Sequence, residues 1–121
     1  MLRIMLKSKI YYARITDLQL YYKGSVTIDE EIMKEADILE GEKVEVLNIN
    51  NGTRLETYAI KGEKRSGTIC LNGPAARTGL KGDNLVILSY GLFQDKELKD
   101  LQVKFVELDE GNKIKSTSLG R

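Results

Sequence analysis

Two stretches of this chain repeat one pattern, and this repeat constrains the fold more than any other feature of the sequence. LEGEKVEVL at residues 39–47 and LKGDNLVIL at residues 80–88 share a leucine, a glycine, an acid and alternating apolar residues in the same places. Each follows a short segment with a helical pattern, so the two copies predict a β-barrel with a local twofold axis. The alternative is a chance likeness of two turns, because Gly-Asp and Gly-Glu are common after helices.

The remainder of the chain is also rich in short strand patterns, which predict a mainly β single domain over residues 1–121 with short helices. Strands are predicted at residues 4–16, 20–29, 43–49, 54–60, 67–72, 84–93 and 101–109, and Asn-Gly within 50–53 predicts a hairpin turn. A helix is predicted over 29–38 with Asp29 as its N-cap, and helical turns over 73–79 and 95–100. The polar residues 110–121 predict a disordered tail.

The composition excludes several kinds of site. The chain has no histidine and one cysteine, so a Ser-His or Cys-His pair and a zinc site built from histidine and cysteine are excluded, and we expect no metal. A single cysteine, Cys70, leaves no internal disulfide and fits a reducing compartment, so a cytoplasmic location is predicted. The net charge of +1 and the absence of a long apolar run predict neither a nucleic-acid nor a membrane partner.

The stretch YYKGSVTID at residues 21–29 places Gly24 and Ser25 inside a strand pattern. Most Gly-Ser pairs are ordinary turns or bulges. However, a strained peptide followed by a hydroxyl also allows Ser25 to attack the carbonyl carbon of Gly24 and form an ester. Elimination from that ester would split the chain and leave dehydroalanine, which hydrolyses to a pyruvoyl group. Such a group is a ketone that forms a Schiff base with an amine.

The parts of the chain before and after the Gly24–Ser25 bond differ in net charge. Residues 1–24 hold five basic side chains and one acid, whereas residues 25–121 hold fourteen basic and seventeen acidic side chains. Opposite charges would help two pieces stay together after a cut between them. A basic edge strand explains the same asymmetry without any cut.

Four segments in their order resemble the aspartate 1-decarboxylase family of pyruvoyl enzymes: MLRIMLKSKIYYARIT, YYKGSVTID, INNGTRLETYAI and LNGPAA. The resemblance extends over residues 1–106. It implies a double-psi β-barrel that cuts itself into residues 1–24 and 25–121, with a covalent pyruvoyl group derived from Ser25 and no pyridoxal phosphate. It also implies conversion of L-aspartate to β-alanine and carbon dioxide for pantothenate and coenzyme A synthesis. It further implies a homotetramer with sites between subunits, and leaves open a protein that assists processing.

The resemblance also implies roles for individual residues. Arg54 and Lys9 would hold the two carboxylates of aspartate, and which side chain holds which is left open. Tyr58 would donate the proton to carbon, because no histidine is present to do so. Thr57 would bind the Gly24 carbonyl during processing and later contact substrate. For each of these residues the ordinary alternative is a solvated cation or a common strand residue.

The segment that begins at Asn72 is implied to bind substrate or ester oxygens through its amide groups. It comprises Asn72, Gly73, Pro74, Ala75 and Ala76, and its ordinary interpretation is an Asx turn before the proline. Tyr22 would line the site near the new chain end.

The chain departs from the family pattern at four positions. Tyr11 and Tyr21 stand where histidine is frequent, Pro74 replaces an alanine, and Val26 replaces a small residue or cysteine. We expect these departures to affect the rate of processing more than the reaction.

Two other interpretations stay open. One is a non-catalytic small β-barrel that binds DNA or a ligand, since a fold alone does not decide function. DNA binding would require a basic stripe that the net charge of +1 does not supply. The other is a relative that keeps the fold and is defective in processing.

Overall fold

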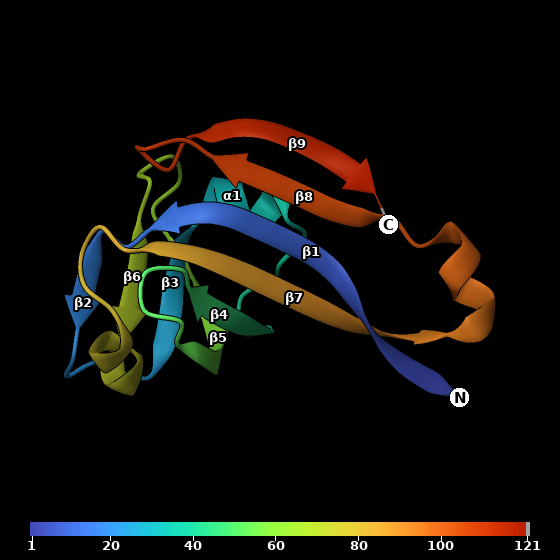
Figure 1. Ribbon diagram of the computed structural model, residues 1–121, viewed down its shortest axis with the longest axis horizontal. Helices are drawn as coiled ribbons and strands as arrows, with labels where there is room; N and C mark the ends of the chain where they lie inside the picture. The colour runs from blue at the N-terminus through green and yellow to red at the C-terminus, as the bar shows by residue number, and fades with distance from the viewer. Residues whose placement is uncertain (121) are drawn as a thin grey trace.

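The structure is a computed structural model that describes residues 1–120. Its elements in chain order are β1 (Leu2–Arg14), β2 (Asp17–Gln19), β3 (Ser25–Asp29), α1 (Glu30–Glu35), β4 (Lys43–Asn48), β5 (Arg54–Gly62), β6 (Ile69–Asn72), the 3₁₀ helix η1 (Gly73–Thr78), β7 (Asn84–Gln94), the 3₁₀ helix η2 (Asp95–Asp100), β8 (Val103–Leu108) and β9 (Ile114–Gly120). The predicted mainly β fold is confirmed (Figure 1). Within residues 1–120, no helix is long and apolar enough to cross a membrane.

The strands close into a barrel around a core of aliphatic side chains. The hydrogen-bonded order is β6, β3, β5, β4, β7 and β1. Past the end of β1 the chain continues through Ile15 and Thr16 into β2, which pairs with β6 and closes the ring. Fully buried side chains fill the interior, among them Ile10, Val26, Ile28, Ala59, Ile69, Leu71, Leu85 and Ile87. Apolar residues that alternate along each strand therefore supply the core.

The sequence repeat corresponds to a local twofold axis. β4 and β7 carry the two copies and pair antiparallel, with Val46 opposite Ile87, which hold the same place in the two copies. Gly41 and Gly82 each donate a backbone hydrogen bond of 2.8 Å to the other half of the barrel. Two parallel pairs, β3 with β5 and β2 with β6, then cross between the halves. This is the predicted double-psi arrangement.

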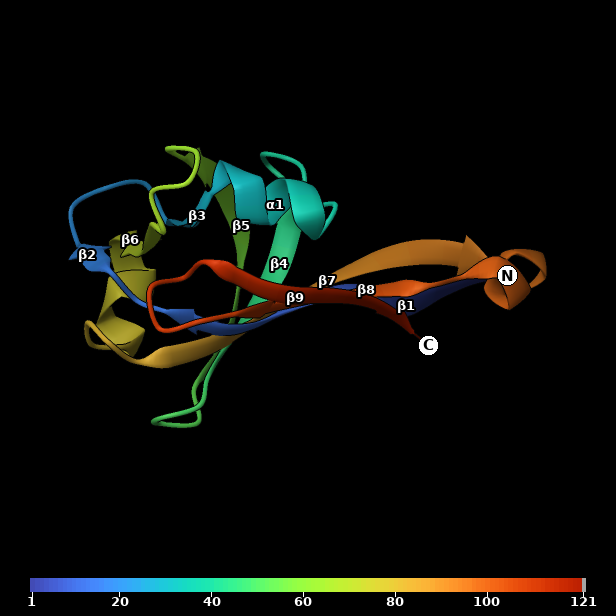
Figure 2. The same cartoon turned by 90° about the horizontal axis from the view of Figure 1, so that it is seen from above.

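Beyond the barrel, β1 and β7 extend into a sheet that they share with β8 and β9 (Figure 2). β1 lies between β7, its antiparallel neighbour, and β8, its parallel neighbour. This projecting sheet carries exposed apolar side chains: Leu2, Ile4, Leu92 and Leu119. Because β1 has a neighbour on both sides, the piece 1–24 would be held in place even without a covalent link to residue 25.

The strand predicted over residues 20–29 is shorter than expected. β3 begins at Ser25, and residues 20–24 form a turn before it. The glycine at position 24 therefore stands at the end of a turn and not inside a strand. Ser25 is left as the first residue of a buried strand.

The prediction of a disordered tail over residues 110–121 is wrong for residues 114–120, and residue 121 lies outside the described residues. Residues 114–120 form β9, which pairs with β8. The turn before β9 is fixed by Asn112, whose buried amide accepts a 2.8 Å hydrogen bond from Arg14 N and donates to Arg14 O (2.9 Å) and Gly67 O (2.8 Å). The polar composition was misleading because β9 is an exposed edge strand, stabilised by its backbone ladder and not by apolar burial.

Replacing Asn112 with glycine tests this attachment. Asn112 has a φ of 60°, which glycine adopts freely, so the variant reports the loss of the side chain alone. Three hydrogen bonds of a buried side chain are lost, and we expect the free energy of unfolding, measured in urea, to fall by about 2–4 kcal/mol. Glu110→Gly in the same turn, where the side chain is exposed, should change stability by less than about 1 kcal/mol. Equal effects of the two substitutions would contradict the role of Asn112.

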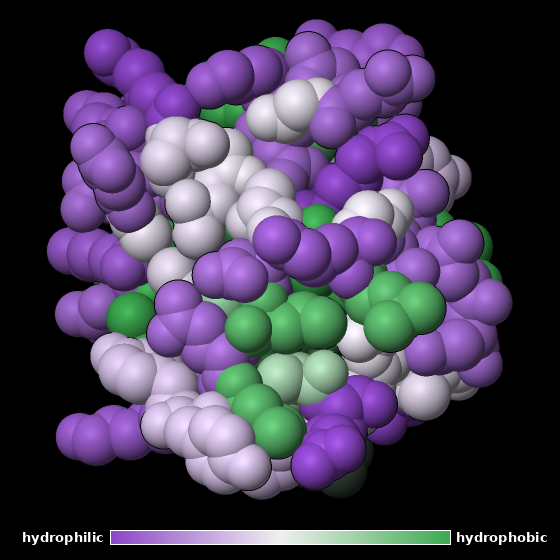
Figure 3. All heavy atoms as spheres, turned by 90° about the vertical axis from the view of Figure 1, so that its left-hand side faces the viewer, coloured by the Kyte–Doolittle hydropathy of each residue, from purple (hydrophilic) through white to green (hydrophobic). Residues whose placement is uncertain are grey.

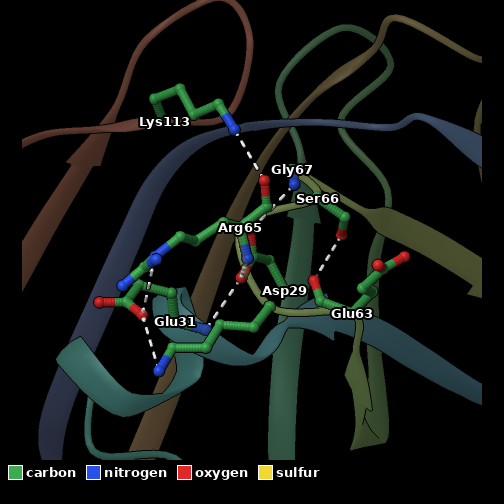
Figure 4. A network of polar contacts seen from close by, with 8 residues as sticks. Asp29, Glu31, Glu63, Arg65, Ser66, Gly67 and Lys113 are labelled. Atoms are coloured by element: carbon green, nitrogen blue, oxygen red, sulfur yellow. Dashed lines mark hydrogen bonds and ion pairs between the residues drawn. The ribbon is translucent and has the colours of Figure 1, made fainter.

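A polar network holds the far end of β3 (Figure 4). The buried Asp29 carboxylate accepts backbone hydrogen bonds from Glu31 (2.8 Å), Arg65 (3.0 Å) and Gly67 (2.9 Å). The first of these is the predicted N-cap of α1. Lys113 donates to the carbonyl of Arg65 at 2.8 Å, which joins the turn before β9 to the same network. β3, which begins at Ser25, is thus anchored at its other end.

Candidate active site

Ser25 and Asn72 lie opposite each other in the antiparallel pair of β3 and β6. Both side chains are buried, with exposed fractions of 0% and 1%. Asn72 Nδ2 donates a 2.9 Å hydrogen bond to Ser25 Oγ, and the Ser25 hydroxyl donates to Lys23 O at 3.1 Å. The structure therefore brings together the predicted nucleophile and one of the predicted amide donors.

Gly73 lies directly against the Gly24 backbone. A Cβ at Gly73 would stand 2.9 Å from both Gly24 Cα and Gly24 N, and 2.8 Å from Tyr22 O. Gly73 also has a φ of +64°, a left-handed conformation that favours glycine. On the other side, Pro74 Cδ would be 3.6 Å from a Cβ at Gly24. The start of η1 thus shapes the place where the Gly24–Ser25 peptide lies.

A cavity of about 290 Å³ opens beside this peptide. Its wall is formed by Gly24, Leu55, Glu56, Thr57, Pro74, Ala75 and Thr78. Thr57 and Gly24 thus share one cavity, as the predicted role of Thr57 requires, while Ala76 is buried in the core. The face on which β2 and η1 lie shows a group of hydrophobic side chains enclosed by hydrophilic ones (Figure 3). We call Gly24, Ser25, Thr57, Asn72 and Gly73 to Ala75 the inner group.

Arg54 and Tyr58 lie on the other face of β5 from Thr57. Arg54 Nη1 is 2.7 Å from Glu45 Oε1 of β4, and Glu56 pairs with Lys43 of the same strand at 2.8 Å. Since side chains alternate along a strand, residues 54, 56 and 58 share this outer face and Thr57 points away from it. Tyr58 is 37% exposed there.

Lys9 lies on β1, and its ammonium nitrogen is 5.8 Å from the centre of the Tyr11 ring. β1 pairs with β7 and β8, whereas Ser25 lies in β3, between β5 and β6. We call Lys9, Arg54 and Tyr58 the outer group. Within a single chain, the predicted site residues therefore lie in two separate places, the inner group and the outer group. Tyr22 is half-exposed, and its carbonyl lies against Gly73.

The outer face carries a larger cavity of about 730 Å³. It is lined by Ile4, Lys7, Glu42, Lys43, Val44, Glu45, Glu56, Tyr90, Gly91 and Leu92. The Tyr90 hydroxyl donates to Glu45 Oε1 at 3.0 Å, so Glu45 contacts both Tyr90 and Arg54. Burial, followed by this hydrogen bond, raises the pKa of Tyr90 above its ordinary value. The sequence analysis missed Glu45 and Tyr90, although the alternation of KVEV could have placed Glu45 outward.

The sequence analysis also missed the hydrogen bonds of two residues near Ser25, Thr27 and Cys70. Asn72 Nδ2 donates a second 2.9 Å hydrogen bond, to Thr27 Oγ1. The Cys70 thiol donates to Asn72 Oδ1 at 3.2 Å. The Cys70 side chain is buried. The sequence held a signal for both residues. Thr27 is two positions from Ser25, and Cys70 is two positions from Asn72, so each pair shares one face of its strand.

The local twofold axis gives the Gly24–Ser25 dipeptide a counterpart, Gly67–Thr68. At the other end of the same strand pair, Asp29 N donates to Thr68 O at 2.9 Å, so Asp29 stands where Asn72 stands opposite Ser25. Here the Gly67 N–H is bound by the Asp29 carboxylate at 2.9 Å, and the Gly67 carbonyl by Asn112 Nδ2 at 2.8 Å. A glycine before a hydroxyl residue is therefore insufficient to define the site. An opposing amide that donates to the hydroxyl distinguishes Ser25.

Comparison with known proteins gives consistent matches. The family described as aspartate decarboxylase matches residues 1–115. An aspartate 1-decarboxylase of Thermoanaerobacter pseudethanolicus is 55% identical over 113 residues, which cover 93% of this chain and 97% of the relative. That of Caldicellulosiruptor saccharolyticus is 56% identical over 114 residues, covering 94% and 89%. That of Moorella thermoacetica is 50% identical over 120 residues, covering 99% and 94%.

Among solved structures, the crystal structure of the rationally designed protein mkDPBB_sym_86 matches with a TM-score of 0.47 and 15% identity. The match covers 64% of this chain and 90% of the designed chain.

Proposed function

Because the chain belongs to the aspartate decarboxylase family, we propose that it prepares itself for catalysis by cutting its backbone between Gly24 and Ser25. Its activity is that of a carboxy-lyase, the decarboxylation of L-aspartate for pantothenate synthesis. The observation that carries the proposal is the buried Ser25 hydroxyl, which accepts a hydrogen bond from Asn72 Nδ2 at the point where Gly73 packs against Gly24.

Residues of the inner group carry out the cleavage of the backbone. Ser25 Oγ attacks the carbonyl carbon of Gly24, the C–N bond breaks, and the nitrogen takes up the hydroxyl proton, which leaves an ester. Loss of the Ser25 Cα proton then breaks the Cβ–O bond and releases Gly24 as a carboxylate. Water hydrolyses the remaining dehydroalanine to a pyruvoyl group and ammonia. Asn72 stabilises negative charge on the Ser25 oxygen, and Thr57 would do the same for the Gly24 carbonyl oxygen.

The residues around Ser25 fit such a group. Position 25 is the first residue of a strand and lies beside a cavity of about 290 Å³ whose wall includes Gly24, Thr57 and Ala75. The ketone supplies an acceptor for the substrate amine and for the electrons left when carbon dioxide departs. The chain's own contribution is to hold the substrate there through Asn72, the backbone of Gly73 to Ala76 and Thr57, with Tyr22 at the entrance.

We propose that the outer group reaches the reaction centre from a neighbouring subunit. Arg54 would bind one carboxylate of aspartate, Lys9 the other, and Tyr58 would donate the proton to carbon. In one chain Arg54 and Tyr58 lie on the face of β5 opposite to Thr57, and Lys9 lies on β1, which does not pair with β3. A second copy would therefore present them. The large outer cavity and the apolar projecting sheet offer surface for this contact. A homotetramer with sites between subunits satisfies this requirement.

Mixed oligomers test the shared site. Ser25→Ala and Arg54→Ala chains are each expected to lack activity, and their co-expression should restore it. At random assembly about a quarter of the sites would combine an intact Ser25 with an intact Arg54 from the neighbour. Aspartate decarboxylation measures the recovery, and intact mass confirms that the Arg54→Ala chain is cut.

A matched mixture is the control for this experiment. Ser25→Ala chains co-expressed with Asn72→Ala chains should show no recovery, because both substitutions affect the inner group of one chain. Absence of recovery in the Ser25→Ala and Arg54→Ala mixture would place the two residues in the same chain's site.

Intact mass under denaturing conditions tests the cut itself. We expect two pieces, residues 1–24 and 25–121, with the larger lighter by about 17 Da than a chain that begins with serine. Under native conditions the pieces should stay together, because β1 lies between β7 and β8. A single chain of unmodified mass after long warm incubation would contradict autonomous self-cleavage. The cytoplasmic location stays a prediction.

A further inference from the structure

Four polar side chains form a square on one face of the β3–β6 pair, and all of them except the half-buried Thr27 are buried. Ser25 is opposite Asn72 and Thr27 is opposite Cys70 in the register of the two strands. Asn72 Nδ2 donates to both hydroxyl oxygens at 2.9 Å, and its Oδ1 accepts from Cys70 Sγ at 3.2 Å. Cys70 is 4% exposed. Every polar atom of the Asn72 amide group is therefore engaged within this square.

The Cys70 thiol favours one of the two possible orientations of the Asn72 side-chain amide. If the amide were turned over, Nδ2 would face a sulfur atom, which is a weak acceptor, and Oδ1 would face the two hydroxyls. Burial, and to a lesser extent the charge of Asp17, raises the pKa of the Cys70 thiol. The thiol therefore keeps its proton at neutral pH and has it available for Asn72 Oδ1. This contact favours the orientation with the amide N–H groups toward Ser25.

We propose that Cys70 is a positioning residue for the self-cleavage, because its thiol holds the Asn72 amide with its N–H groups toward Ser25 Oγ. The inference rests on the proposed function. The amide hydrogens carry partial positive charge, which stabilises the charge that develops on Oγ as the hydroxyl proton leaves. The chain has no histidine that could compensate for a misplaced donor. Cys70 touches no reacting atom and acts only through Asn72.

Two substitutions of Cys70 separate the effect of its hydrogen-bond donor from the effect of its side-chain volume. Cys70→Ser keeps a hydrogen-bond donor, whereas Cys70→Val fills a similar volume without one. Uncut precursor of each is followed by intact mass over time, and thermal unfolding of the precursor checks the fold. We expect Cys70→Val to be cut about tenfold more slowly than the unsubstituted chain, since one hydrogen bond controls the donor. Cys70→Ser should be cut within about threefold of that chain.

The outcomes are distinguishable. A Cys70→Val chain cut at the unsubstituted rate would overturn the inference, and so would a Cys70→Ser chain slowed as much as Cys70→Val, because rescue by the retained donor is required. If either precursor melts well below the unsubstituted chain, its rate is measured at a temperature where both chains are folded. Failure of the unsubstituted chain to be cut at all would instead refute the proposed function.

Discussion

Replacing Ser25 with alanine is expected to leave the chain uncut and to abolish aspartate decarboxylation. Alanine has no oxygen to attack Gly24, so neither the ester nor the pyruvoyl group forms. The loss should exceed about a thousandfold, since no other nucleophile takes the place of the hydroxyl. Intact mass should show one chain, and β-alanine production should fall to the background rate.

The fold should survive this change. The Ser25→Ala chain loses the hydrogen bond from Asn72 and the one that Ser25 donates to Lys23 O, each worth about 1 kcal/mol, while Asn72 Nδ2 keeps its bond to Thr27. The matched control is Thr27→Val, which removes the other bond of the same amide and leaves the nucleophile in place. That chain should still be cut. Undiminished decarboxylation by Ser25→Ala would show that the reaction does not depend on this residue.

Replacing Gly73 with alanine is expected to slow self-cleavage by about a hundredfold or more. The new Cβ would lie 2.9 Å from Gly24 Cα and N, which are backbone atoms that cannot turn aside. The peptide that must be attacked is therefore displaced, and a displacement of about 1 Å costs about a hundredfold in rate. The rate of appearance of the piece 25–121, by intact mass, measures the effect.

A substitution at a second glycine separates the effect of displacing the Gly24 backbone from the effect of backbone strain. Gly82 has a φ of +90°, and a Cβ there would meet nothing within 4 Å. Gly82→Ala therefore incurs the left-handed backbone penalty of about 1–2 kcal/mol without a clash. It should lower stability and leave the cleavage rate unchanged. Equal slowing of cleavage in both variants would contradict a specific role for the packing of Gly73 on Gly24.

Local patterns were good predictors where a single segment carries its own signal. Asn-Gly marked the hairpin between β4 and β5, and Asp29 marked the start of α1 because an N-cap is satisfied within a few residues. The repeat in residues 39–47 and 80–88 predicted the twofold correctly. In contrast, β9 was missed, because its stability comes from pairing with β8 and from Asn112, which reaches Arg14 far away in the sequence.

For the site, the sequence by itself determined which chemistry is open to the chain. The absence of histidine, the Gly24–Ser25 dipeptide and the segments around Arg54 and Asn72 pointed to a serine that is converted into the reactive group. Only the tertiary structure decided where these residues lie. Alternation along β5 sends Thr57 toward Gly24 and Arg54 toward Glu45, and the pairing of β3 with β6 brings Cys70, Asn72 and Ser25 together. Such contacts join residues distant in sequence, so strand register and facing determine them and local composition does not.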